Sequence, residues 1–430
     1  MSKPIQIGLL GAGVVGSGVI KILREKESEI ERQVGAKVIV SGALVNDKSK
    51  KRDFSFTKDF FVDSATEIIG NPELDIVVEL MGGEEPAYGY IKNSLQQGKH
   101  VVTANKEVMA KYCQEILSLA KANDVRVMFE SSVGGGTPVI SPLIRDLLAN
   151  DIHSIRAIIN GTTNYILTRM ASEYVDYSAV LHDAQDLGYA ESDPTNDVEG
   201  IDAAYKLAIL STLGFRCEVK DTDVYREGIT KLSASDFVYA DELGFNIKLL
   251  AMADRNGNKI QARVHPVLIE RNDMLAKVDG VLNAVEIDTD LVSKVLFHGP
   301  GAGSLPTGSA VVADVVNISR SIVAGMSIPD PVTLTNNYEI ASMNELNCQY
   351  YIRLNAKDQP GVLAQISAVL GGNGISISSF IQKDSGNSSG NAELVIMTHL
   401  SNEKSIQNAL LEIGKLSVVN EVSNTLRVLD

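Results

Sequence analysis

Short apolar runs that end in glycine or polar residues alternate with helical patterns in the N-terminal part of the chain. Runs of this length predict buried strands, at 4–10, 36–45, 74–83, 99–107 and 124–138. A glycine turn and a helix follow the first run at 11–30, and another helical pattern occupies 87–98. This alternation predicts a doubly wound parallel sheet of the Rossmann type within residues 1–130.

A different pattern follows in the middle of the chain. Further strands are predicted at 154–164, 259–269, 283–290 and 293–303. A helix is predicted at 201–215. We interpret residues 131–307 as an α+β domain, and we expect the apolar helix predicted at 308–323 to return to the first domain.

The C-terminal pattern predicts a small domain of its own. Residues 327–347 contain two prolines and many polar positions, and we interpret them as a linker. Residues 348–430 then predict strands and helices in the order βαββαβ, which is that of the ferredoxin-like fold. The expected fold class is therefore α/β, with a Rossmann-type parallel sheet, an α+β domain and a ferredoxin-like domain.

The length, net charge and cysteine spacing of the chain limit which partners and which cellular compartment we expect for it. A chain of 430 residues is too long for one core, and its net charge of −15 argues against nucleic acid and anionic membranes as partners. Cys113, Cys217 and Cys348 lie far apart, without metal or disulfide spacing, which fits a reducing compartment. The sequence shows neither a signal-peptide pattern nor a run of membrane-spanning length, so we expect a soluble cytoplasmic protein.

A G-x-G-x-x-G pattern stands between the first predicted strand and its helix. The first glycine permits a tight turn, the second lets the backbone approach a pyrophosphate, and the third lets helix and strand pack closely. The helix N-terminus then faces the phosphates. This order predicts a dinucleotide site, and the alternative is a purely structural turn. The predicted loop consists of Gly11, Ala12, Gly13, Val14, Val15 and Gly16.

The tip of the second predicted strand bears on the choice of dinucleotide. An acidic residue there usually binds the ribose 2′-hydroxyl, whereas a cation accommodates a 2′-phosphate. Asn46 stands at this tip, and Lys50 belongs to the basic run 48–52 that follows. We therefore favour NADP, with NAD not excluded. The alternative is that the basic run is a solvated turn.

The stretch 188–210 places a single lysine on an apolar helix that follows a group of acids. Asp202 and Lys206 are four residues apart, so their side chains share one face of a helix. A partly buried lysine beside a carboxylate can have its pKa tuned for proton transfer near neutral pH. The alternative is a structural ion pair at the start of the helix.

The fixed residues of this stretch resemble the signature of homoserine dehydrogenases. The match covers Ala184-x-x-x-Gly188-Tyr189-Ala190-x-x-Asp193-Pro194-x-x-Asp197-Val198-x-Gly200-x-Asp202-x-x-x-Lys206. Other stretches resemble motifs of the same family, namely GLLGAGVVGSGV, TANKE, ESSVGGGTPVI, NGTTNYILTRM and GPGAGSLPTGSAV. A last stretch resembles an ACT regulatory domain, DQPGVLAQISAVLGGNGISISS. The resemblance covers nearly the whole chain and is closest to the monofunctional bacterial form.

The resemblance implies reversible hydride transfer between NAD(P)H and L-aspartate 4-semialdehyde, which gives L-homoserine. It implies Lys206 as the proton donor and Asp202 as the residue that holds and tunes it. Lys106 is implied as a second cation at the nicotinamide and the substrate. Glu191 and Asp197 are implied in substrate binding, with Glu191 at the α-ammonium group.

The resemblance also implies further cofactor contacts and an ion. Thr103 and Ala104 would approach the nicotinamide ribose, and Gly301 would approach the cofactor by its backbone unless it is a plain bend. A sodium ion is implied in the loop 130–137, with mainly backbone carbonyl ligands; the alternative is an empty glycine loop. The implied ligands are Glu130, Val133, Gly135 and Thr137.

For the C-terminal domain the resemblance implies an amino-acid effector site, with threonine as the effector. The alternative is that this domain only mediates oligomerisation. The implied assembly is a homodimer formed through the substrate domain, or a homotetramer joined by the C-terminal domains. The predicted effector residues are Asp358, Pro360, Gly361, Val362, Leu363, Asn373 and Ile375.

Two other functions compete with this interpretation. Another Rossmann-type amino-acid dehydrogenase would share the glycine loop but lack Glu191, Asp202 and Lys206 together. A non-enzymatic amino-acid sensor would keep the C-terminal pattern and need not keep Lys106 and Lys206. The complete motif disfavours both.

Overall fold

The computed structural model describes residues 3–50, 59–326, 332–335, 337–384 and 390–429. The chain divides into two compact units. The first comprises Met1–Ile155, Ala204–Val224 and Leu282–Tyr338, and the second comprises Arg156–Ala203, Tyr225–Val281 and Glu339–Asp430. Strand β7 (Ile152–Ile158) and helix α9 (Ile201–Phe215) have residues in both units.

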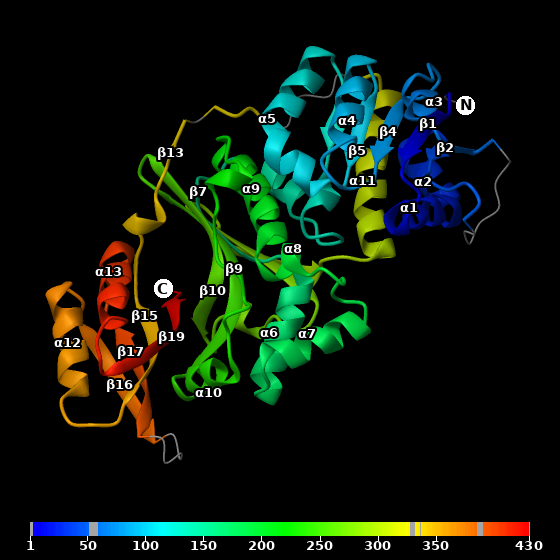
Figure 1. Cartoon of the computed structure of the whole chain (residues 1–430). Coiled ribbons are helices and arrows are strands. Elements are labelled where there is room, and N and C mark those ends of the chain that lie inside the picture. The colour runs from blue at the N-terminus through cyan, green and yellow to red at the C-terminus, as the bar shows by residue number, and fades with distance from the viewer. Residues whose placement is uncertain (1–2, 51–58, 327–331, 336, 385–389, 430) are drawn as a thin grey trace. The chain divides into compact units, whose positions relative to one another are not determined.

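A parallel sheet organises the first unit (Figure 1). Its strand order is β3-β2-β1-β4-β5-β6, and every pairing is parallel. This is the doubly wound order, so the Rossmann-type prediction is confirmed. The strands are β1 (Ile5–Leu10), β2 (Val38–Leu44), β3 (Phe61–Val62), β4 (Ile76–Glu79), β5 (His100–Thr103) and β6 (Val127–Met128).

Helices cover both faces of this sheet because buried strands need apolar cover on each side. Alternate side chains of β1 point to opposite faces: Ile7 and Leu9 pack with the helices α1, α2 and α11, and Leu10 packs with α3. Helices α4 and α5 also pack together. The helices are α1 (Val14–Glu25), α2 (Glu27–Val34), α3 (Ala65–Ile69), α4 (Ala87–Gln96), α5 (Lys106–Ala122) and α11 (Ser304–Val323).

Helix α11 joins the Rossmann-type sheet although it is remote in the sequence. Its apolar residues Val311, Val315 and Ile318 belong to the same core as β1 and α1. Helices α1 and α11 cross closely, since a Cβ on Gly18 would lie 2.2 Å from the carbonyl oxygen of Ser304. The first unit also contains the antiparallel hairpin of β11 (Leu282–Thr289) and β12 (Ser293–Pro300).

In the second unit, one mixed sheet unites a long hairpin with the C-terminal domain. The hairpin consists of β9 (Phe245–Asn256) and β10 (Lys259–Glu270). Strand β19 pairs with β10 in parallel, Val267 with Arg427, and with β15 in antiparallel. The C-terminal strands follow in the order β19-β15-β17-β16, namely β15 (Tyr350–Lys357), β16 (Ile377–Asp384), β17 (Asn391–Thr398) and β19 (Val419–Val428).

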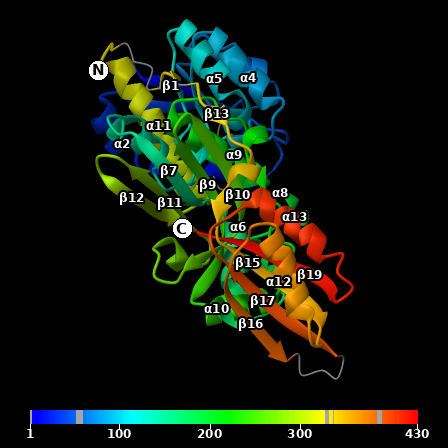
Figure 2. The ribbon, with the colours of Figure 1, turned by 90° about the vertical axis from the view of Figure 1, so that its left-hand side faces the viewer.

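The C-terminal strands and two helices make the predicted βαββαβ domain. Helices α12 (Val362–Gly372) and α13 (Glu403–Ile413) contact each other and pack on the C-terminal sheet (Figure 2). Ile366, Leu370 and Ile406 supply the helical side of its core. The ferredoxin-like prediction is therefore confirmed. The other helices of the unit are α6 (Gly161–Glu173), α7 (Tyr177–Asp186), α8 (Thr195–Val198) and α10 (Ala234–Glu242).

The end of the stretch expected to be a linker is structured. Strand β13 (Glu339–Ile340) pairs with β10, and β14 (Asn347–Cys348) pairs with β18 (Ser401–Asn402). Lys259 on β10 forms an ion pair of 2.6 Å with Glu345 between these short strands. Residues 339–348 are thus fixed against both the hairpin and the C-terminal domain, and β8 (Tyr225–Arg226) pairs with the same edge of β10.

A buried network of charges holds α10 against the C-terminal sheet. Asp236 is fully buried and accepts hydrogen bonds from Arg353 Nε at 2.8 Å and from Asn424 Nδ2 at 2.9 Å. Arg353 also donates to Glu393 at 2.7 Å. Because buried charges are costly unless paired, this network makes the contact specific. Among the helices that the structure describes, none is both long enough and apolar enough to span a membrane.

Candidate active site

The glycine loop lies at the carboxyl end of β1 and leads into α1. Gly11 has φ of +106°, and a Cβ there would lie 2.8 Å from the carbonyl oxygen of Leu80. A Cβ on Gly16 would lie 2.4 Å from the carbonyl oxygen of Gly11, so the third glycine permits the close packing of turn and helix. Gly13 differs, because no described atom lies within 4 Å of its Cβ position. Its open face suits the approach of a phosphate.

The tip of β2 carries the residues predicted to select the dinucleotide. Asn46 is exposed directly after this strand. Asp47 accepts hydrogen bonds from the N–H and the hydroxyl of Ser49, so its carboxylate stabilises the turn. Lys48 forms an ion pair of 2.8 Å with Asp63. Lys50 is exposed, while Lys51 and Arg52 lie outside the described residues.

A buried carboxylate connects the carboxyl ends of β4 and β5. Glu79 is fully buried and accepts hydrogen bonds from the hydroxyl of Thr103 at 2.6 Å and the N–H of Met81 at 2.7 Å. Burial raises the pKa of Glu79, and these hydrogen bonds oppose the shift. The Thr103 side chain is thus engaged in the fold. Thr103 is fully buried, whereas Ala104 is half-buried, so Ala104 is the one of the two with exposed surface.

Lys106 is the first residue of α5 and is half-buried. Asn105 caps this helix, since its side-chain oxygen accepts a hydrogen bond from the N–H of Val108 at 3.1 Å. The amide of Asn105 also donates to the carbonyl of Gly83 at 2.7 Å. The TANKE motif therefore fixes the end of β5 and places Lys106 at the start of α5.

The loop after β6 is held by its own glutamate. The carboxylate of Glu130 accepts hydrogen bonds from the N–H groups of Val139, Ile140 and Ser141 at 2.6, 2.9 and 2.6 Å. Burial raises the pKa of Glu130, and these donors oppose the shift. The N–H of Glu130 donates to Asp314 at 2.9 Å. Because its carboxylate is engaged, Glu130 can offer a cation only its backbone carbonyl.

Gly135 and Gly301 approach each other within the first unit. Gly135 has φ of +55°, and a Cβ there would lie 2.3 Å from the carbonyl oxygen of Gly301. A Cβ on Gly301 would lie 2.2 Å from the amide of Asn283, which is buried. Thr137 is also buried, with its hydroxyl 3.5 Å from the carbonyl of Pro300. No side chain fits at Gly301, which explains the glycine at this position.

The signature stretch forms a turn-rich segment that leads into α9. Gly188 and Gly200 have positive φ, +75° and +74°, which explains these two glycines. The Asp193 carboxylate accepts hydrogen bonds from the N–H and the hydroxyl of Thr195, the first residue of α8. These hydrogen bonds lower the pKa of Asp193. Glu191 is exposed in the loop between α7 and α8.

One amide bridges two carboxylates of the signature. Asn160 Nδ2 donates to Asp197 Oδ1 at 2.7 Å and to Asp202 Oδ2 at 2.8 Å. Asn160 also caps α6, because its Oδ1 accepts a hydrogen bond from the N–H of Thr163 at 2.8 Å. Asn160 and Asp202 are buried, with 5% and 3% of their surface exposed. The start of α6 therefore orients the acids that precede Lys206.

Helix α9 has the predicted bounds, so Asp202 and Lys206 stand one turn apart on it. Asp202 is buried in its first turn and Lys206 is half-buried. The flanking residues Ala203, Ala204 and Leu207 are buried. Lys206 thus lies on an apolar helix, one turn after the buried carboxylate of Asp202.

The predicted effector residues occupy both ends of α12. Gly361 caps its N-terminus with φ of +90°, and Asp358 accepts a hydrogen bond from Gln382 at 3.3 Å. Asn373 caps the C-terminus. A helix of 11 residues is about 16 Å long, so a single chain does not bring the two groups together. Val362 and Ile375 are buried in the domain core, and Leu363 is 40% exposed.

Sequence reasoning overlooked Asn160, Glu79 and Asn283. Asn160 stands three residues before Thr163 at a change from apolar run to helix, and such an N-cap pattern was available as a signal. Glu79 ends an apolar run, but nothing local predicts its bond to Thr103. Asn283 lies on a strand and acquires its place only through the approach of Gly301.

Three family profiles match successive parts of the chain. "Homoserine dehydrogenase, NAD binding domain" matches residues 11–130, "Homoserine dehydrogenase" matches 138–316, and "ACT domain" matches 350–418. The homoserine dehydrogenase of Synechocystis sp. is 43% identical over 434 residues, and that of Neisseria gonorrhoeae is 42% identical over 435 residues. Each alignment covers 99% of both chains.

Solved structures show the same similarity. The crystal structure of a homoserine dehydrogenase from Thiobacillus denitrificans superposes with a TM-score of 0.93 at 41% identity, over 100% of this chain and 99% of that one. A hyperthermophilic archaeal homoserine dehydrogenase in complex with NADPH superposes with a TM-score of 0.63 at 29% identity. This second match covers 74% of the present chain and 98% of the archaeal one.

Proposed function

The chain belongs to the homoserine dehydrogenase family and is an NAD(P)-dependent oxidoreductase acting on a CH–OH group, and we propose which residues carry its reaction. The reaction is the reversible reduction of L-aspartate 4-semialdehyde to L-homoserine. The observation that carries the proposal is that the amide of Asn160 binds both Asp197 and Asp202. Asp202 lies one helical turn before Lys206 on α9.

Lys206 donates the proton in the reducing direction. The aldehyde oxygen gains negative charge as the carbon accepts a hydride, and a positioned ammonium group neutralises that charge. Lys206 is half-buried and lies one helical turn after the buried carboxylate of Asp202. Asn160 holds that carboxylate in place. In the oxidising direction the neutral amine of Lys206 accepts the hydroxyl proton.

Acidic residues receive the ammonium end of the amino-acid substrate. Glu191 is exposed and binds the α-ammonium group. Asp197, which shares the amide of Asn160 with Asp202, supports the same end. Lys106, half-buried at the start of α5, is the second cation of the reaction. Its replacement is expected to lower kcat, because it lies at a strand end of the kind that binds ligands in doubly wound sheets.

The chain's own residues suit a nicotinamide dinucleotide, which supplies the hydride when bound. The open Cβ position of Gly13 and the N-terminus of α1 favour a pyrophosphate. Asn46 and Lys50 are exposed where the adenosine ribose would lie, and we assign a preference for NADP to them. Ala104, which is half-buried next to the buried Thr103, and the backbone of Gly301 complete the contacts.

A sodium ion fits the chemistry of the loop 130–137. Its proposed ligands are the backbone carbonyls of Glu130, Val133, Gly135 and Thr137, and hard oxygen donors suit such a cation. The buried Asp314 carboxylate accepts a hydrogen bond from the backbone N–H of Glu130 at 2.9 Å, and the Glu130 side chain is buried as well, so a positive charge near these two acids would be stabilising. Among the described residues no group of three or more His, Cys, Asp or Glu side chains could hold a metal ion.

The test of the catalytic proposal compares Lys206→Ala and Lys106→Ala with the wild type. NADP or NAD reduction by L-homoserine is followed by absorbance, with a melting curve for each variant. We expect folded Lys206→Ala to lose at least about 100-fold in kcat, as is usual for a general acid–base group. Activity within a few-fold of wild type in that variant would assign the proton transfer to another group.

We further propose that threonine is the effector of the C-terminal domain. The supporting observation is the positive φ of Gly361 at the start of α12, after the Asp358 turn. Inhibition by L-threonine should appear in the wild type and weaken in Asp358→Ala. If neither the wild type nor Asp358→Ala were inhibited by L-threonine, the domain would be left with a role in oligomerisation. Light scattering would then report whether the protein is a dimer or a tetramer.

A further inference from the structure

A buried arginine on the last strand binds two acids that belong to different parts of the second unit. Arg427 lies on β19 and is 4% exposed. Its Nε and Nη2 donate to the two carboxylate oxygens of Glu403 at 2.8 and 2.7 Å. Its Nη1 and Nη2 donate to the two oxygens of Glu227 at 3.0 and 2.9 Å. Each acid is therefore held by a pair of hydrogen bonds, the strongest arrangement between a guanidinium group and a carboxylate.

One of these acids belongs to the C-terminal domain and the other lies outside it. Glu403 is the first residue of α13, is buried, and also accepts a hydrogen bond from the hydroxyl of Tyr350 at 2.7 Å. It is thus fixed within the ferredoxin-like domain. Glu227 directly follows β8, and its side chain is 35% exposed. Because this longer side chain borders on solvent, its contacts with Arg427 and with the hydroxyl of Tyr225 are what orient it.

The residues that follow β8 pack directly against the signature stretch. A Cβ on Gly228 would lie 2.5 Å from the carbonyl oxygen of Val198, so a glycine is needed for this close approach. The N–H of Ile229 donates to the same carbonyl oxygen at 2.9 Å. The hydroxyl of Thr230 donates to the carboxylate of Glu199 at 3.2 Å. The position of this segment therefore determines the position of Val198 and Glu199.

These contacts fall between the two acids that the amide of Asn160 bridges. Asp197 precedes the contacted residues in the sequence, and Asp202 follows them. Gly200 lies between the two acids, and a Cβ there would lie 3.8 Å from the carbonyl oxygen of Glu227. A displacement of Glu227 and the residues after it would therefore disturb the stretch that places both acids.

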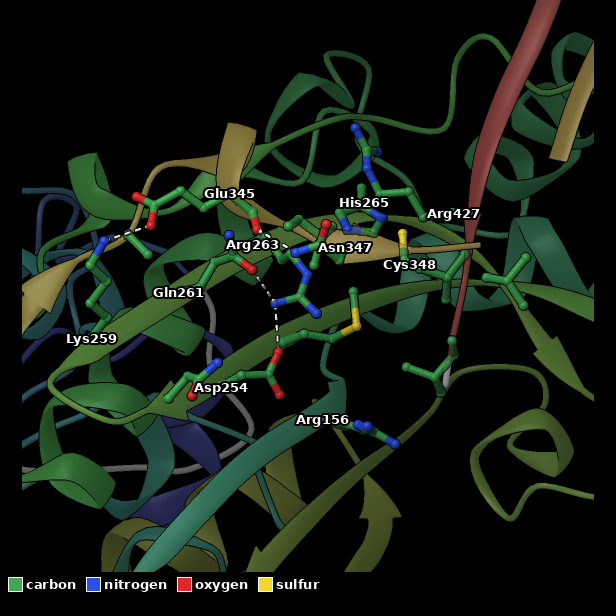
Figure 3. Close-up of a pocket in the computed structure, with 17 residues that line it drawn as sticks. Arg156, Asp254, Lys259, Gln261, Arg263, His265, Glu345, Asn347, Cys348 and Arg427 are labelled. Carbon is green, nitrogen blue, oxygen red and sulfur yellow. Dashed lines mark hydrogen bonds and ion pairs between the residues drawn. The ribbon is translucent and has the colours of Figure 1, made fainter. Parts of the chain in front are cut away.

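The surroundings of Arg427 offer it no substitute for these partners. Figure 3 shows Arg427 among the residues that line a cavity of the second unit. Of the described residues in this lining, two are acidic, Asp254 and Glu345, and each is paired with another cation (dashed lines in Figure 3). His265 is buried in the same lining, and burial together with the nearby guanidinium groups holds its pKa well below the ordinary value. The ring is therefore uncharged, and the charge of Arg427 is balanced by the two acids described above.

We propose that Arg427 is a positioning residue for the amino-acid substrate. Through Glu227 it holds the segment 227–230 against the signature stretch, and so keeps in place the acids that receive the ammonium end of the substrate. Because Arg427 belongs to the C-terminal domain, the affinity for this substrate depends on how that domain is packed. The inference rests on the function proposed above. The glycine loop that we assign to the dinucleotide belongs to the first unit, so the effect concerns one of the two substrates.

Steady-state kinetics on the full chain, with L-homoserine and the dinucleotide varied in turn, tests this inference. Glu227→Gln keeps the size of the side chain and removes its charge. Arg427→Lys keeps a positive charge and loses the paired hydrogen bonds. Gly228→Ala leaves both ion pairs in place and puts a methyl group against the signature stretch. The matched control is Glu393→Gln on β17, because Glu393 binds another buried arginine, Arg353, at 2.7 Å. Melting curves establish which variants are folded.

We expect folded Glu227→Gln to raise the KM for L-homoserine at least about fivefold, the lower end of the couplings measured between sites in proteins. The KM for the dinucleotide should stay at the wild-type value. Arg427→Lys and Gly228→Ala, where they fold, should act in the same direction, and Glu393→Gln should change neither KM. The inference is overturned if folded Glu227→Gln keeps the wild-type KM for L-homoserine, if both KM values rise together, or if Glu393→Gln has the same effect. Absence of turnover by the wild type would instead refute the function proposed above, so the two failures are distinguishable.

Discussion

Asn160 is the most informative residue to change, because its side-chain amide forms hydrogen bonds with three partners at once. Its Nδ2 donates to Asp197 and Asp202, and its Oδ1 caps α6. Each hydrogen bond to a charged group contributes about 1.5–3 kcal/mol, and the cap about 1 kcal/mol. Asn160→Ala removes all three contacts. Asn160→Ser keeps a capping oxygen and removes only the bridge between the carboxylates.

The expected effect of Asn160→Ser is on catalysis more than on folding. If about 3 kcal/mol of the bridge is felt in the transition state, kcat/KM for L-homoserine falls about 100-fold. The loss should be mainly in kcat, because the bridge orients Asp202 beside Lys206. Asn160→Ala should show a similar kinetic loss together with a lower Tm, since the cap is lost as well.

A control of the same type stands one turn further along α6. Asn164 is also buried, but its Nδ2 donates to the carbonyl of Val278 at 3.1 Å. Asn164→Ser should lower the Tm and leave kcat/KM within about fivefold of wild type, since the hydrogen bond to the Val278 carbonyl that it removes does not involve Asp197 or Asp202. The reasoning would be refuted if folded Asn160→Ser kept wild-type kcat/KM, or if both serine variants lost activity equally.

Three further predictions concern the cofactor, the domain contact and the effect of pH. Gly13→Ala should raise KM for NADP at least about tenfold without lowering the Tm, because its Cβ meets no described atom within 4 Å but would meet a pyrophosphate; an unchanged KM would place the phosphates elsewhere. Asp236→Ala should lower the free energy of unfolding by about 3 kcal/mol in urea titrations, since it removes a buried carboxylate partner of Arg353 and leaves the guanidinium bonded to Glu393 and Ser233. The control Asp241→Ala, at an exposed ion pair, should cost less than about 1 kcal/mol, and equal losses would contradict the argument. His265 is neutral when folded and gains a proton on unfolding below about pH 6.5, so unfolding free energy should fall there by up to about 1.4 kcal/mol per pH unit. His265→Phe should reduce that slope, and an unchanged slope in urea titrations at several pH values would argue against a buried neutral ring.

Local patterns were sufficient for much of the fold. The apolar run and its flanking residues gave α9 its observed bounds, 201–215. The order of strands and helices was sufficient for the Rossmann-type sheet and for the βαββαβ domain. The extent of each helix and strand depends largely on near neighbours in the sequence, and periodicity reports such contacts directly.

Features that depend on distant partners were not accessible. The predicted strand 154–164 in fact ends at Ile158, and Asn160 caps the helix α6 that follows. The bonds of its amide to Asp197 and Asp202 reach 37 and 42 positions along the chain. The stretch expected to be a linker gains order at β13 by pairing with β10. Neither partner is visible within a sequence window. The Asp236 network likewise joins residues more than 100 positions apart, as in Asp236 with Arg353.

The pairing of β10 with β19 has a consequence for how the protein is made. Val267 and Arg427 pair across 160 residues, so β10 is synthesised long before its neighbour. Strands β8 and β13 pair with other parts of this edge, but until β19 leaves the ribosome the edge at Val267 and Leu268 lacks its strand, and an unpaired edge invites association with other chains. A chain truncated within the C-terminal domain would therefore be prone to aggregation rather than a smaller active enzyme. Protection of this edge during translation becomes a requirement of the fold.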